Sequence, residues 1–172
     1  MVAKPLIMSQ NYLAMVRGSR ELHHLLALGM DDSPEADAIR DETDGPWNAL
    51  TEVERNRVRY HSEDLYSLHE PPPVAQPMNP EVQAKLIEAY EAKRCGEWDK
   101  ALDLLRVCRA YLDPAEVSYI RGSIWLEAGD TETAMLYFEN AAKLNPVNVG
   151  YQYMLSHASN ISASLSLETA CP

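Results

Sequence analysis

Residues 115–148 read AEVSYIRGSIWLEAGDTETAMLYFENAAKLNPVN, and this stretch decides the fold of the 172-residue chain. It repeats the preceding stretch with a period of 33 residues, so that Gly96 is followed by Gly129 and Ala101 by Ala134. The other equivalent pairs are Ala89 with Gly122, Leu105 with Phe138 and Cys108 with Ala141. One repeat of this length cannot bury its apolar face alone, so successive copies stack and share a core.

Local chemistry indicates that each copy is a pair of helices. Asn79-Pro80 and Asp113-Pro114 each place a capping side chain before a proline at the first helical position. Gly96 and Gly129 fall where the first helix of each copy must end. In the second helix, the spacing of Ala134, Phe138 and Ala141 puts one large and two small residues on one face, which lets two helices approach closely.

The second copy resembles a tetratricopeptide repeat, a helix–turn–helix unit of about 34 residues. The residues that carry the resemblance are Gly122 and Trp125 in the first helix, Gly129-Asp130 in the turn, Ala134, Phe138 and Ala141 in the second helix, and the closing Pro146. The first copy, residues 82–113, matches less closely. Residues 148–161 resemble one further helix in the same phase, of the kind that covers the last repeat of an array.

The sequence therefore predicts an all-α protein, a helix-turn-helix repeat similar to a tetratricopeptide α-solenoid, preceded by a three-helix N-terminal segment. The N-terminal segment spans residues 1–70, with helices over 9–28, 33–50 and 51–68 and a kink or break at Gly45-Pro46. Residues 71–79 form a proline-rich linker. The repeats and their capping helix take residues 80–162, and residues 163–172 are expected to be a flexible tail.

Composition limits the classes of partner. The chain has 15 basic and 26 acidic side chains and a net charge of −11, which argues against nucleic acid as a partner. This charge is typical of a solvated acidic surface, and the alternative interpretation is a preference for a protein or peptide partner with basic segments. No apolar run is long enough to span a membrane, and no signal peptide is apparent. The three cysteines, Cys95, Cys108 and Cys171, have no metal-binding spacing and fit a reducing, cytoplasmic setting.

No pattern of residues indicates catalysis. His23 and His24 are adjacent and would point about 100° apart on a helix, while His61 lies on an apolar stripe, so a hydrogen-bonded core histidine is the default interpretation. The signatures of phosphate-binding loops, dinucleotide sites, serine hydrolases and zinc proteases are missing. We expect no catalytic residue, no metal and no cofactor.

The resemblance implies a binding surface. In such arrays the first helices of successive units line a concave groove, where a row of tyrosines would offer contact area with little loss of entropy. The groove-facing positions that it implies are Leu86, Tyr90, Lys93 and Arg94 in the first copy, Tyr119, Ser123, Leu126 and Glu127 in the second, and Tyr153 and His157 in the last helix. The alternative is that the N-terminal helices cover this groove and the tyrosines belong to the core.

Two charged residues depart from the family pattern at one repeat position. Glu88 and Arg121 stand where an apolar residue is usual, and their opposite charges suggest an ion pair between neighbouring helices, with independent exposure to water as the alternative. Three functional hypotheses follow. The first is a protein–protein interaction scaffold or adaptor that binds a segment in the groove. The second is a structural homodimer without an open groove, and the third, with the least support, is an enzyme or metal-binding protein without a recognisable signature.

Overall fold

The computed structural model describes residues 8–169 of the chain, with side chains for residues 8–163. Over this range the protein is all-α, as predicted, and holds eight α-helices, two short 3-10 helices and no strand. The helices fall into two compact units, whose described parts are residues 8–71 and 72–169. No helix in the described range is long and apolar enough to cross a membrane.

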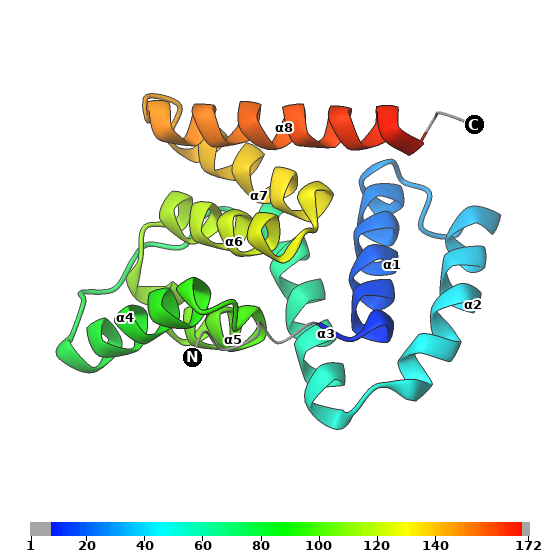
Figure 1. Cartoon of the computed structure of the whole chain (residues 1–172), viewed down its shortest axis with the longest axis horizontal. Helices are drawn as coiled ribbons and strands as arrows, with labels where there is room; N and C mark the ends of the chain where they lie inside the picture. Colours follow the sequence, from blue (N-terminus) through cyan, green and yellow to red (C-terminus); the bar gives the residue numbers. More distant parts are fainter. Residues whose placement is uncertain (1–7, 170–172) are drawn as a thin grey trace. The chain divides into compact units, whose positions relative to one another are not determined.

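The first unit consists of three helices, and α1 (Gln10–Ala27) is the one that packs on both of the others. Helix α1 packs on both α2 (Pro34–Ala49) and α3 (Glu52–Tyr66), and a 3-10 turn, η1 (Ser67–His69), follows α3 (Figure 1). The backbone of α1 approaches the Thr43 side chain of α2 closely at Gly18, where an added Cβ atom would lie 2.5 Å from Cγ2 of Thr43. His61 lies on the buried face of α3 together with Val58 and Leu65.

Gly45-Pro46 does not break the helix, because α2 continues through Pro46 to Ala49. Proline disfavours the helical region for the residue before it through a clash with that residue's Cβ. Gly45 has no Cβ and so escapes much of this restriction.

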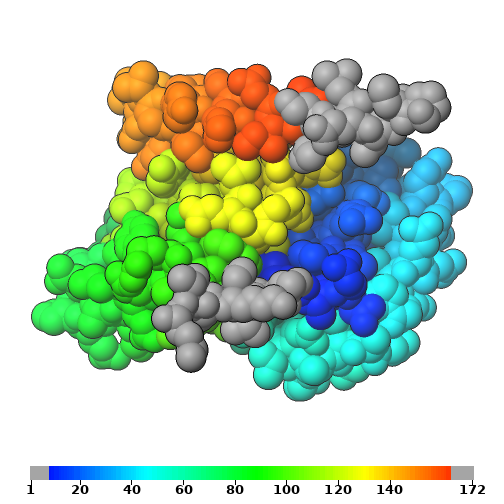
Figure 2. Space-filling view, viewed as in Figure 1, coloured from blue at the N-terminus to red at the C-terminus, as the bar shows by residue number. Residues whose placement is uncertain are grey.

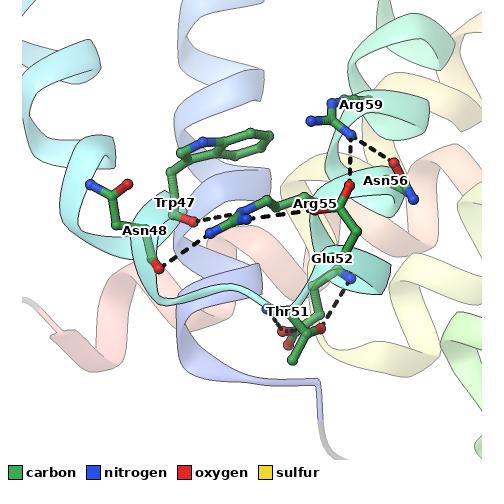
Figure 3. A network of polar contacts seen from close by, with 8 residues as sticks. Trp47, Asn48, Thr51, Glu52, Arg55, Asn56 and Arg59 are labelled. Atoms are coloured by element: carbon green, nitrogen blue, oxygen red, sulfur yellow. Dashed lines mark hydrogen bonds and ion pairs between the residues drawn. The ribbon is translucent and has the colours of Figure 1, made fainter.

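Side chains brace the corner between α2 and α3 (Figure 3). Arg55 donates hydrogen bonds to the backbone carbonyls of Trp47 and Asn48, at 3.3 and 3.4 Å. The guanidinium groups of Arg55 and Arg59 lie 5.8 and 5.4 Å from the centre of the Trp47 ring. Two cations thus face the half-buried indole while one of them holds the last carbonyls of α2.

The second unit is a succession of helices in which each packs on the next (Figure 1). Figure 2 shows the same succession at the surface as bands of green, yellow and orange. The elements are α4 (Pro80–Arg94), α5 (Trp98–Cys108), η2 (Arg109–Tyr111), α6 (Pro114–Ala128), α7 (Thr131–Leu144) and α8 (Val149–Thr169). The pairs α4–α5 and α6–α7 therefore follow the two copies of the 33-residue pattern.

The predicted caps and stops of these helices are confirmed. The Asn79 side chain accepts a hydrogen bond from the backbone N–H of Val82, and Asp113 caps α6 in the same way. Gly96 and Gly129 have backbone φ angles of 75° and 94°, in the left-handed region that glycine adopts at little cost. These signals fix where each helix begins and ends.

The crossing of α6 and α7 is the tightest contact of the second unit. A Cβ atom built on Gly122 would lie 2.8 Å from two ring carbons of Phe138 and 3.1 Å from the backbone oxygen of Ala134. Phe138 and Ala134 are fully buried, as is Trp125 on α6. The small residues of the repeat therefore allow the close approach of helices that the sequence predicted.

One boundary differs from the predicted one. Helix α8 runs to Thr169, whereas residues 163–172 were expected to form a flexible tail; residues 163–169 contain no glycine or proline that would end the helix earlier. Residues 170–172 lie outside the described range. The proline-rich connector is extended, and the backbone N–H of Gln76 donates to the carbonyl of Ala110 at 2.8 Å, which ties the connector to η2.

Candidate interaction face

The candidate site is the face of the second unit to which α4, α6 and α8 contribute, the first helices of the successive pairs. We call it the tyrosine face, defined by Tyr90, Tyr119 and Tyr151. The ring centres of Tyr119 on α6 and Tyr151 on α8 lie 5.1 Å apart. Tyr119 also lies 6.0 Å from Phe138, so it joins the face to the core beneath it. Tyr90 on α4 remains 45% exposed.

The electrostatics of the tyrosine face place a carboxylate beside the phenols. Burial raises the pKa of Tyr90, and the charge of Glu116 is the next largest cause, followed by the neighbouring Tyr119 and Tyr151. Burial likewise raises the pKa of Tyr151, again followed by the charge of Glu116. Tyr90 and Tyr151 are therefore neutral at physiological pH and keep their hydroxyl protons.

An ion pair crosses from α4 to α6 on this face. Lys93 Nζ contacts Glu127 Oε1, and the lysine side chain is largely covered. Arg94, in contrast, pairs with Glu91 of its own helix at 2.7 Å and is exposed. Of the two basic residues that the sequence assigned to the groove, Lys93 connects two helices and Arg94 connects none.

Three of the predicted groove residues contribute packing more than open surface. Leu86 is half-buried and packs on the core shared by α4, α5 and α6. Ser123 is buried, and its hydroxyl donates to the carbonyl of Ile120 on the same helix at 2.8 Å. Leu126 is half-buried. These positions are therefore less open to a partner than the resemblance implies.

The last helix meets α6 at a residue that the sequence analysis did not include. Tyr151 contacts Tyr119, whereas Tyr153 is 67% exposed and stacks on His157, at 6.0 Å between ring centres. The sequence predicted Tyr153 on this face by assuming that the repeat pattern continues from α6 into α8. The residue that contacts Tyr119 is instead Tyr151, two positions earlier. The sequence offers tyrosines at both positions, and the periodicity alone does not choose between them.

Glu88 and Arg121 do not form the predicted ion pair. Glu88 is exposed and pairs with Lys100 of α5 at 2.9 Å. Arg121 is buried, and its guanidinium lies 5.7 Å from the centre of the Tyr137 ring. The arginine therefore faces α7, whereas the glutamate faces α5.

The remaining candidates for reactive groups are metal-binding clusters and the cysteine thiols. The described residues hold no cluster of three or more His, Cys, Asp or Glu that could bind a metal ion. Within the described range Cys95 is exposed and Cys108 is buried, and both are free thiols; Cys171 lies outside it. Burial raises the pKa of the Cys108 thiol, which keeps it protonated and unreactive.

One titratable pair stands out in the first unit. The Nε2 atoms of His23 and His69 lie 2.9 Å apart, so one ring donates a hydrogen bond and the other accepts it. His23 is buried, and its Nδ1 atom has no hydrogen-bond partner among the described residues. Burial lowers the pKa of His23, and the neighbouring His69 and His24 add to the effect. His23 is therefore a neutral core histidine at physiological pH.

Comparisons with protein-family models, with curated proteins and with solved structures found no match to this chain.

Proposed function

We propose that the chain is a helical interaction module, a scaffold or adaptor that binds a peptide or protein segment on the tyrosine face. The observation that supports this proposal is the group of three tyrosines, Tyr90, Tyr119 and Tyr151, contributed by three helices and partly open to solvent. Tyrosine is enriched in binding hot spots because it offers a large rigid ring and a hydroxyl for few lost rotamers.

The face is held in place by the fold beneath it. Tyr119 rests between Phe138 and Tyr151, and the Lys93–Glu127 ion pair joins α4 to α6. A preformed surface binds more tightly than one that must be ordered, since less entropy is lost on association. The proposed partner is a segment with basic residues, which suits the net charge of −11, and not a nucleic acid.

The proposed setting is cytoplasmic, because the thiols of Cys95 and Cys108 are free. We propose no catalytic role. The family resemblance of residues 82–161 to tetratricopeptide repeats stays part of the proposal. It agrees with helices of equivalent position that begin 33 or 34 residues apart.

The test uses the whole chain as bait for a displayed library of random linear peptides, followed by calorimetry on the selected peptides. Tyr90→Ala should weaken binding by about fivefold or more, which corresponds to about 1 kcal/mol. Val107→Ala, which removes an exposed apolar side chain from α5, is the control and should bind as the wild type does. The proposal is wrong if no peptide is selected or if Tyr90→Ala binds unchanged.

Self-association is the alternative function, with a second copy of the chain covering the tyrosine face. Light scattering of the free chain over a range of concentrations separates the two. A single-chain mass agrees with an open face. A dimer that Tyr90→Ala dissociates would favour the alternative.

A further inference from the structure

The tyrosine face contains a carboxylate that the fold leaves without a cation. Helix α6 carries Glu116 and Glu127, separated by about three turns. Glu127 is neutralised by Lys93. Glu116 is half-buried, and its carboxylate has no ion pair and no hydrogen bond within the described part of the chain. Helix α4 thus supplies a cation to Glu127 but none to Glu116.

Glu116 also does not form the hydrogen bond of a capping box at the start of α6. Glu116 is the third residue of α6, after the cap Asp113, and Glu54 holds the same position in α3, after the cap Thr51. Glu54 folds back and accepts a hydrogen bond from the Thr51 backbone at 2.9 Å, which completes a capping box. Glu116 makes no such bond to Asp113, so its carboxylate remains available.

The surroundings of Glu116 suit a positive charge. Tyr119 lies one turn further along α6, on the same side of the helix, and its ring packs on that of Tyr151. The charge of Glu116 reaches both Tyr90 and Tyr151, whose pKa values it raises after the larger effect of burial. Aromatic faces carry partial negative charge, so rings and carboxylate together attract a cation and repel an anion.

The basic residues of α4 are already engaged. Lys85 pairs with Glu81 at 3.3 Å and Arg94 with Glu91 at 2.7 Å, both within α4. Lys93, as described, pairs with Glu127. The helix that adjoins the cluster therefore has no spare cation for Glu116. A positively charged ligand would find this carboxylate without a competing partner on α4.

We infer that Glu116, Tyr90, Tyr119 and Tyr151 form a cation site that takes an arginine side chain of the bound segment. This inference rests on the proposed function of the tyrosine face. Arginine fits better than lysine because its planar guanidinium stacks on an aromatic ring and offers paired N–H donors to a carboxylate. The proposed site thus predicts that the partner presents an arginine at this position, a requirement that the fold by itself does not indicate.

The test uses the peptides selected by display and two matched variants. Glu116→Gln removes the charge with nearly the same shape, and Glu139→Gln makes the same change at an exposed carboxylate of α7. We expect the selected peptides to be enriched in arginine. We also expect Glu116→Gln to weaken them about fivefold or more, Glu139→Gln to leave them unchanged, and raised salt to reduce the difference. Melting curves of both variants check that the fold is retained.

A double-mutant cycle completes the test, with arginine of the peptide replaced by citrulline, its neutral analogue. Coupling between this replacement and Glu116→Gln supports the site. Additive effects overturn it, as does a selected set without arginine that binds Glu116→Gln as tightly as the wild type. If such peptides still lose affinity with Tyr90→Ala, only the cation site is wrong. If Tyr90→Ala has no effect, the proposed function fails as well.

Discussion

Tyr119 of α6 packs against Tyr151 of α8, with 5.1 Å between ring centres, and against Phe138 of α7. One side chain therefore belongs both to the candidate binding face and to the core that supports it. This double role decides which variants can test binding without disturbing the fold.

Tyr119→Ala should lower the free energy of unfolding by about 2 kcal/mol, because it removes half-buried aromatic contacts with two helices. Tyr90→Ala should cost less than about 1 kcal/mol, since Tyr90 is largely at the surface. Urea denaturation measures both. Equal costs would show that Tyr90 is also part of the core and would remove it as a clean probe of binding.

Gly122→Ala should destabilise the second unit by about 1–3 kcal/mol, because the added methyl would lie 2.8 Å from the Phe138 ring. In an open helix the same change stabilises by about 0.5–1 kcal/mol, so the sign of the effect is diagnostic. The contrast is Gly150→Ala in the first turn of α8, whose added methyl would lie 3.1 Å from Oδ1 of Asn148, the end of a side chain that can move, rather than against a buried ring. A stabilising Gly122→Ala would contradict the close crossing of α6 and α7.

His23 should make the first unit less stable in acid. Its pKa is lowered in the folded protein, by burial first and then by His69 and His24, while the unfolded chain has the ordinary value of about 6.5. Its contribution is therefore fully present above about pH 6.5 and is lost as the pH falls through the lower folded value. His23→Gln should reduce the difference in stability between pH 8 and pH 5, measured by denaturation. An unchanged difference would show that other groups cause it.

Glu88 and Arg121 should behave as independent residues. Glu88 pairs with Lys100, and Arg121 faces Tyr137, so the changes Glu88→Leu and Arg121→Met should add to within about 0.5 kcal/mol. A double-mutant cycle in urea measures this. A coupling well above that limit would mean that the two charges interact despite their separate partners.

Local signals in the sequence predicted the helices well. The side chains of Asn79 and Asp113 cap the backbone N–H groups of the residues that follow them, and Gly96 and Gly129 end their helices through their own φ angles. These signals are local and need no knowledge of distant residues. Pro46 does not break α2, because the preceding glycine relaxes the restriction that proline usually imposes.

Contacts between helices were harder to predict. Periodicity identifies the side of a helix that faces its neighbour, but the crossing geometry decides which residue meets which, and so Tyr151 was missed at the face. Glu116 was missed for another reason. Its interest lies in the absence of a partner among the described residues, and a sequence does not show which charges are paired.

The three tryptophans are divided between the two units, with Trp47 in the first and Trp98 and Trp125 in the second. Trp47 is half-buried under two guanidinium groups, whereas Trp125 is fully buried, so their fluorescence should differ in colour and in quenching. A chain with Trp47→Phe would report on the second unit alone, and its melting curve, set beside circular dichroism of the whole chain, would reveal whether the two units unfold together or one after the other.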